Sequence, residues 1–104
     1  MTARASVASC CAVGLTVATL VAHAQADAPP PPPQAQACTA CHGPNGNSTQ
    51  PLYPILAGQT ARYIYLQLRD FQEGRRSDPQ MSPMAAGLSR DEMRAIADWF
   101  SKQK

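Results

Sequence analysis

Valine is missing from most of this 104-residue chain. All of its valines fall within the first 21 residues, and isoleucine and threonine are sparse after that point. Aromatic residues, the other good strand formers, make up only 6% of the sequence. β-Sheets are built mainly from these residue types. The scarcity therefore predicts an all-α fold.

An excess of charge of one sign is also missing. Beyond residue 26, eight Arg or Lys residues face seven Asp or Glu residues, and the charges are dispersed rather than clustered. Nucleic-acid-binding domains carry a basic stripe or patch. We therefore expect no nucleic-acid partner.

One apolar run lies near the N-terminus. Arg4 precedes an Ala-rich and Thr-rich run over residues 7–22, and small-x-small sites end at Ala24 and Ala26. These features are typical of a secretory signal peptide, which we predict at residues 1–26. We therefore expect the protein to be exported to the periplasm. The run is short for a bilayer span, so no permanent membrane span is expected, although a retained anchor is the alternative.

The exported part is poor in the means of stabilising a small fold. It has 78 residues, fourteen of them Leu, Ile, Met, Phe or Trp, and its only cysteines are Cys38 and Cys41. Domains of this size often need disulfides, a metal or another aid. These two cysteines are too close in sequence to tie the chain together, so a large apolar cofactor is expected to complete the core.

Proline divides the exported chain. Residues 27–36 predict a linker because Pro29–Pro33 is an unbroken run that favours polyproline II. One domain follows over residues 37–104. Within it, residues 75–88 contain Pro79 and Pro83 and are predicted to be a loop that the cofactor holds.

Three helices are predicted. A short one covers residues 34–42 and ends at a Gly-Pro-Asn-Gly-Asn loop. A second, capped by Thr60, runs to about Gln72, with Gly74 as its stop. The third follows Ser89, which forms a capping box with Glu92.

The stretch Cys38-Thr39-Ala40-Cys41-His42 carries the chemistry. A Cys-x-x-Cys-His sequence is a signal for covalent attachment of c-type haem. On a helix, positions i, i+3 and i+4 share one face. The two thiols can therefore add to the two vinyl groups of one porphyrin, while the His42 imidazole reaches the iron.

Two other interpretations of the cysteine pair remain open. A redox dithiol would be expected in a βαβ setting, which this sequence lacks. A zinc site would need a second Cys or His cluster, but His42 is the only histidine beyond residue 26. Both fit the sequence less well than haem attachment.

The chain resembles a class I cytochrome c, especially the bacterial single-haem and di-haem electron carriers of the periplasm. The matching text covers residues 37–101: CTACHGPNGN, YPILAGQTARYIYLQLRDFQEGRR and MSPMAAGLSRDEMRAIADWFS. This resemblance implies a cytochrome c fold of about three helices around one covalently bound haem. It also reveals a departure: the family has a full helix before its Cys-x-x-Cys-His, whereas the proline run leaves little room for one here. Met93, Trp99 and Phe100 are therefore expected to lose part of their usual cover.

The resemblance also implies the surroundings of the iron. The Pro54 carbonyl should accept the Nδ1–H of His42, and Leu56 should pack on the porphyrin. Met81 should be the sixth ligand, because related carriers place the first methionine of Met-x-x-Met-x-x-x-Leu-Ser on the iron. Met84 is the alternative. Cofactor-binding residues are thus Cys38, Cys41, His42 and Met81, with His42 and Met81 as iron ligands.

The function that follows is single-electron transfer rather than enzymatic catalysis. A dehydrogenase or quinol-oxidising complex would be the donor, and an oxidase or reductase the acceptor. Two alternatives remain: a haem peroxidase or gas sensor with an open iron site, and a haem subunit that the proline run tethers to a larger oxidoreductase.

Overall fold

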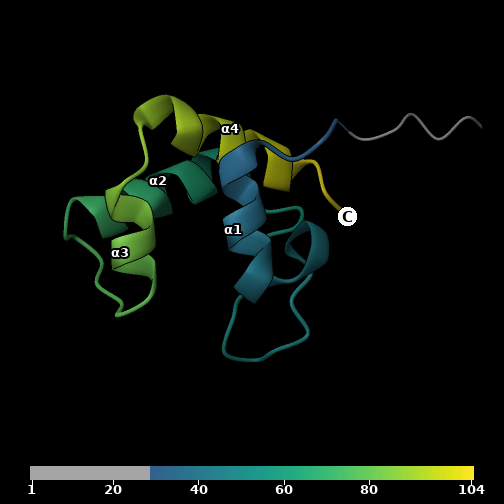
Figure 1. Cartoon of the computed structure of the whole chain (residues 1–104), viewed down its shortest axis with the longest axis horizontal. Coiled ribbons are helices and arrows are strands. Elements are labelled where there is room, and N and C mark those ends of the chain that lie inside the picture. The colour runs from purple at the N-terminus through teal and green to yellow at the C-terminus, as the bar shows by residue number, and fades with distance from the viewer. Residues whose placement is uncertain (1–28) are drawn as a thin grey trace, which may run out of the picture.

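The computed structural model describes residues 29–104, and this part of the chain is helical with no strand (Figure 1). The expected signal segment, residues 1–26, lies outside the described residues. The elements of the described part are α1 (Pro33–His42), the 3-10 turn η1 (Pro44–Gly46), α2 (Ala61–Gln72), α3 (Met81–Ala86) and α4 (Arg90–Ser101). Within residues 29–104, no helix has the length and apolar character needed to cross a membrane. The predicted all-α class is confirmed.

The core forms where α2 packs against α4. Ile64 and Leu68 of α2 lie one turn apart and are buried, as are Met93, Ile96 and Phe100 of α4. Residues spaced by three or four positions share one face of a helix. Each helix therefore turns its single apolar face to the other.

Both helices begin at the predicted caps. The Thr60 hydroxyl accepts a hydrogen bond from the Tyr63 amide at 3.3 Å. Ser89 and Glu92 form the reciprocal capping box: Ser89 Oγ accepts from the Glu92 amide at 3.1 Å, and Glu92 Oε2 accepts from the Ser89 amide at 2.7 Å. These bonds satisfy amides that have no partner inside the helix.

The prediction of a plain loop over residues 75–88 is wrong, because α3 lies within it. Pro83 does not prevent this helix, since it is the third residue of α3. Amides of the first helical turn have no acceptor within a helix, so proline loses nothing there. α3 packs against α2 (Figure 1).

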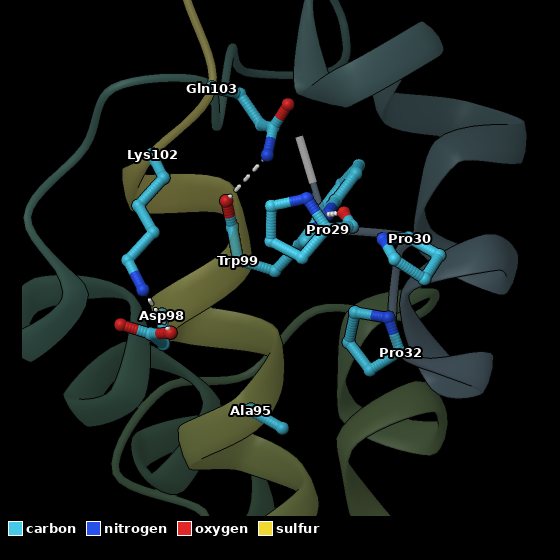
Figure 2. Close-up of a pocket in the computed structure, with 8 residues that line it drawn as sticks. All are labelled: Pro29, Pro30, Pro32, Ala95, Asp98, Trp99, Lys102 and Gln103. Atoms are coloured by element: carbon cyan, nitrogen blue, oxygen red, sulfur yellow. Dashed lines mark hydrogen bonds and ion pairs between the residues drawn. The ribbon is translucent and has the colours of Figure 1, made fainter. Parts of the chain in front are cut away.

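α1 and the prolines before it together cover α4: Ala35 of α1 is fully buried in the same core cluster as Met93, Trp99 and Phe100. Pro33 is the first residue of α1, a position that suits proline, so the last part of the expected linker is helical. Before it, the Pro29 carbonyl accepts a hydrogen bond from Trp99 Nε1 at 3.0 Å (Figure 2). Trp99 is 7% exposed, and Met93 and Phe100 are fully buried. The expectation that these three side chains lose cover is therefore wrong.

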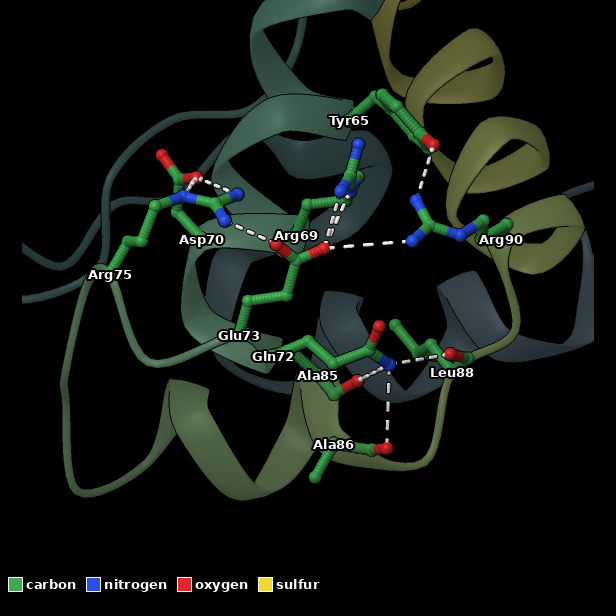
Figure 3. Close-up of polar contacts among 10 residues, drawn as sticks. All are labelled: Tyr65, Arg69, Asp70, Gln72, Glu73, Arg75, Ala85, Ala86, Leu88 and Arg90. Atoms are coloured by element: carbon green, nitrogen blue, oxygen red, sulfur yellow. Dashed lines mark hydrogen bonds and ion pairs between the residues drawn. The ribbon is translucent and has the colours of Figure 1, made fainter.

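A surface network of ion pairs surrounds Glu73 at the end of α2 (Figure 3). Its carboxylate pairs with Arg69 at 2.5 Å and with Arg75, and Arg90 lies 3.7 Å away. Arg69 and then Arg75, as hydrogen-bond donors, lower the pKa of Glu73 to about 2 from an ordinary value of 4.5. Glu73 thus stays ionised in the folded protein at pH values that would protonate it in the unfolded chain.

The Glu73→Gln variant is expected to lose stability at neutral pH and to be less sensitive to acid than the parent. A carboxylate with a lowered pKa stabilises the fold above its unfolded pKa of 4.5, and that contribution is lost as the pH falls toward about 2. Denaturant unfolding between pH 5 and pH 2 measures the difference. Because the group is exposed, 1 M salt should shrink it. Parallel pH profiles for parent and variant would contradict this prediction.

Candidate haem site

The last turn of α1 brings three of the predicted site residues together. Cys38, Cys41 and His42 lie at i, i+3 and i+4 of this helix, and such positions share one face. The helix ends at Gly43, whose φ of 80° suits glycine. A Cβ at Gly43 would lie 2.6 Å from the Asn47 carbonyl oxygen. No larger residue fits there, so His42 is fixed as the final helical residue.

His42 is held in a single orientation. The residue is 6% exposed, and its Nδ1 lies 2.7 Å from the carbonyl oxygen of Pro54. A carbonyl can only accept, so Nδ1 is the protonated nitrogen that donates. In the neutral ring, Nε2 then keeps a free lone pair for a metal. The contact expected from the family resemblance is present.

Gly46 anchors the loop that presents the Pro54 carbonyl. Its own carbonyl oxygen accepts hydrogen bonds from the amides of Leu56 at 2.9 Å and Ala57 at 3.2 Å. A Cβ at Gly46 would lie 2.8 Å from the Phe100 ring. The sequence indicated only that Gly46 lies in a turn. Its close approach to Phe100 of α4, 54 positions further along the chain, leaves no signal in the residues around Gly46.

The two cysteines occupy different surroundings. Cys38 is half-buried against the core and its Sγ lies 3.6 Å from the Gln34 carbonyl oxygen, whereas Cys41 is exposed. Burial raises the pKa of the Cys38 thiol. Both cysteines are free thiols, as covalent attachment of a porphyrin requires.

The two candidate methionines also differ. Met81 is the first residue of α3, is half-buried and packs against the core cluster that Cys38 and Leu56 also contact. Met84 is 47% exposed and lies outside that cluster. The structure thus places Met81 and Cys38 at the edge of the same core, on different helices.

The residues present fit a haem. They supply two free thiols, one imidazole nitrogen with an unused lone pair, and a thioether at the border of the same core. Thioether and imidazole are common axial ligands of haem iron. Leu52 and Ile55, on either side of Tyr53 and Pro54, are more than half exposed, which gives apolar surface that a porphyrin can cover.

The model of the cytochrome c family matches residues 32–104 of the chain. The chain belongs to the cytochrome c family. Membership implies a covalently bound haem c with its iron. The described helices agree with the cytochrome c fold, and the chain resembles one half of a di-haem class I cytochrome.

Individual relatives support this assignment. The chain is 41% identical to cytochrome c4 of Pseudomonas aeruginosa over 86 residues, which is 83% of this chain but 43% of the relative. It is 39% identical to cytochrome c-554(548) of Halomonas halodenitrificans over 70 residues, covering 64% of this chain and 84% of the relative.

A solved structure has the same fold. The crystal structure of reduced recombinant cytochrome c4 from Pseudomonas stutzeri superposes with a TM-score of 0.59 and 35% sequence identity, covering 64% of this chain and 38% of that one. The chain therefore spans less than half the length of the cytochromes c4 that it resembles.

Proposed function

We propose that this chain carries single electrons through one haem c in the periplasm. Cys38 and Cys41 hold the haem through thioether bonds, and His42 and Met81 ligate its iron. The observation that carries the proposal is the arrangement at the end of α1, where His42 shares a face with both thiols and keeps Nε2 available because Nδ1 is committed to Pro54.

The bound haem would supply an iron that alternates between the ferric and ferrous states. The chain's own residues keep the surroundings of that iron constant. The Pro54 carbonyl fixes the imidazole ring and increases its donor strength. The thioether of Met81 favours ferrous iron and so raises the reduction potential. Fixed ligands limit the rearrangement that accompanies each electron, which suits a carrier rather than an enzyme.

We also propose the kind of partners this carrier has. A dehydrogenase or a quinol-oxidising complex would donate electrons, and an oxidase or a reductase would accept them. The signal at residues 1–26 would place the carrier in the periplasm. The sequence contains one Cys-x-x-Cys-His, at residues 38–42, which supports one haem in this chain.

A pyridine haemochrome spectrum of the full chain, purified after export, tests the proposal. We expect a c-type spectrum with one haem per chain and a reversible one-electron titration. The same chain without residues 1–26 is expected to stay in the cytoplasm without covalent haem, because maturation takes place after export. Rapid binding of carbon monoxide by the native ferrous protein would instead favour an enzyme or gas sensor with open iron.

A further inference from the structure

The short helix that carries Met81 is secured from outside itself. α3 has six residues, far fewer than an isolated helix needs to be stable in water. Its position therefore depends on contacts made by neighbouring segments. Side chains make such contacts at both of its ends.

Asp78 secures the N-terminal end of α3. Its Oδ1 accepts hydrogen bonds from the backbone amides of Gln80 at 2.8 Å and Met81 at 2.9 Å. Ser82 Oγ in turn accepts from the Asp78 amide at 3.0 Å. The acceptor is a carboxylate, which forms the stronger kind of hydrogen bond with backbone amides.

Gln72 secures the C-terminal end of α3 from the neighbouring helix α2 (Figure 3). Its Nε2 donates to the carbonyl oxygens of Leu88 at 2.7 Å and Ala85 at 3.0 Å, with Ala86 at 3.4 Å. Carbonyls at the end of a helix have no acceptor role within it. One side chain thus ties the end of α3 to the helix that builds the core.

We propose that Asp78 is a positioning residue for the Met81 sulfur, acting with Gln72 to hold α3 in place so that the methionine is presented to the iron. This inference rests on the proposed ligation by Met81. Asp78 does not touch the iron; it fixes the backbone at the residue that bears the ligand. The bond between iron and sulfur then depends on a carboxylate three residues earlier in the chain.

The test uses the exported, haem-loaded chain with Asp78→Ala and Asp78→Asn. Losing a side chain that accepts from the amides at the start of a helix, as a capping residue does, should shift the equilibrium between Met81-bound and open iron by roughly tenfold toward the open state. We therefore expect Asp78→Ala to bind carbon monoxide in the ferrous state about tenfold faster than the parent, with a weaker far-red sulfur-to-iron band and a lower reduction potential. Asp78→Asn keeps an acceptor oxygen, so its carbon monoxide rate, far-red band and reduction potential should lie close to those of the parent. Gln72→Leu should act in the same direction as Asp78→Ala.

Two further variants separate the possible failures. Asp98→Ala is the matched control: it removes the same carboxylate from an exposed ion pair with Lys102 on α4 and should leave all three readings unchanged. Met81→Ala reports on the ligand itself. If Met81→Ala abolishes the far-red band while Asp78→Ala keeps the parental band, potential and carbon monoxide rate, the positioning role is wrong and the ligation stands. A lower unfolding temperature of Asp78→Ala without any change at the iron would overturn the role equally. If Met81→Ala retains the band, both the ligation and this inference fail.

Discussion

The Cys38→Ser/Cys41→Ser double variant is expected to carry no covalent haem and to accumulate poorly after export. Without its two thiols the chain cannot form thioether bonds, and a core this small depends on the cofactor. The buried apolar residues lie mainly along one face each of α2 and α4, and α1 adds only Ala35 to this small core. The single variants Cys38→Ser and Cys41→Ser should each retain little haem through the one remaining bond.

Covalent haem is measured by haem-stained denaturing gels and the pyridine haemochrome spectrum, and folding by circular dichroism. Ala40→Ser is the matched control: it introduces the same residue at an exposed position between the two cysteines and should retain full haem. A double Ser variant that accumulates as a stable, folded apo-protein would refute the dependence of the core on haem.

The Met81→Ala variant is expected to open the iron to carbon monoxide, to lose the weak far-red band of the ferric protein and to have a lower reduction potential. Thioether sulfur favours ferrous iron, so its loss favours the ferric state. The Met84→Ala variant should keep all three properties, because Met84 is exposed and lies outside the core cluster that Met81 contacts. Its role is then that of an adaptable apolar side chain.

Comparison of the two methionine variants decides the assignment. Both side chains belong to α3 and both substitutions introduce a good helix former, so a change in helix stability alone should affect them alike. If Met84→Ala abolishes the far-red band and Met81→Ala preserves it, then Met84 is the ligand and the proposed site is wrong at that residue.

Local signals were enough to predict much of this protein. The caps at Thr60 and Ser89 are each properties of one segment, and the structure has them as predicted. The spacing of Cys38, Cys41 and His42 predicted their common helical face for the same reason. The family resemblance added the contact between His42 and Pro54, which joins residues twelve positions apart and leaves no mark in either segment alone.

Local signals failed where distant segments meet. Pro79 and Pro83 indicated a loop, yet α3 forms, with the Asp78 carboxylate accepting from the Met81 amide at its start and Gln72 of α2 donating to carbonyls at its end. The proline run indicated lost cover for α4, yet the Pro29 carbonyl meets the Trp99 indole across 70 positions.

The sequence by itself determined the helical class, the helix caps and the haem-attachment turn, because each arises from the chemistry of neighbouring residues. The family resemblance implied which nitrogen of His42 is free and which methionine is the ligand, but only the tertiary structure shows the His42–Pro54 hydrogen bond, the packing of Met81 at the core and the contacts that hold α3 in place. Those outcomes depend on hydrogen bonds and packing between residues distant in sequence, such as His42 with Pro54 and Gln72 with Leu88. Such contacts form only when the whole fold has brought the partners together.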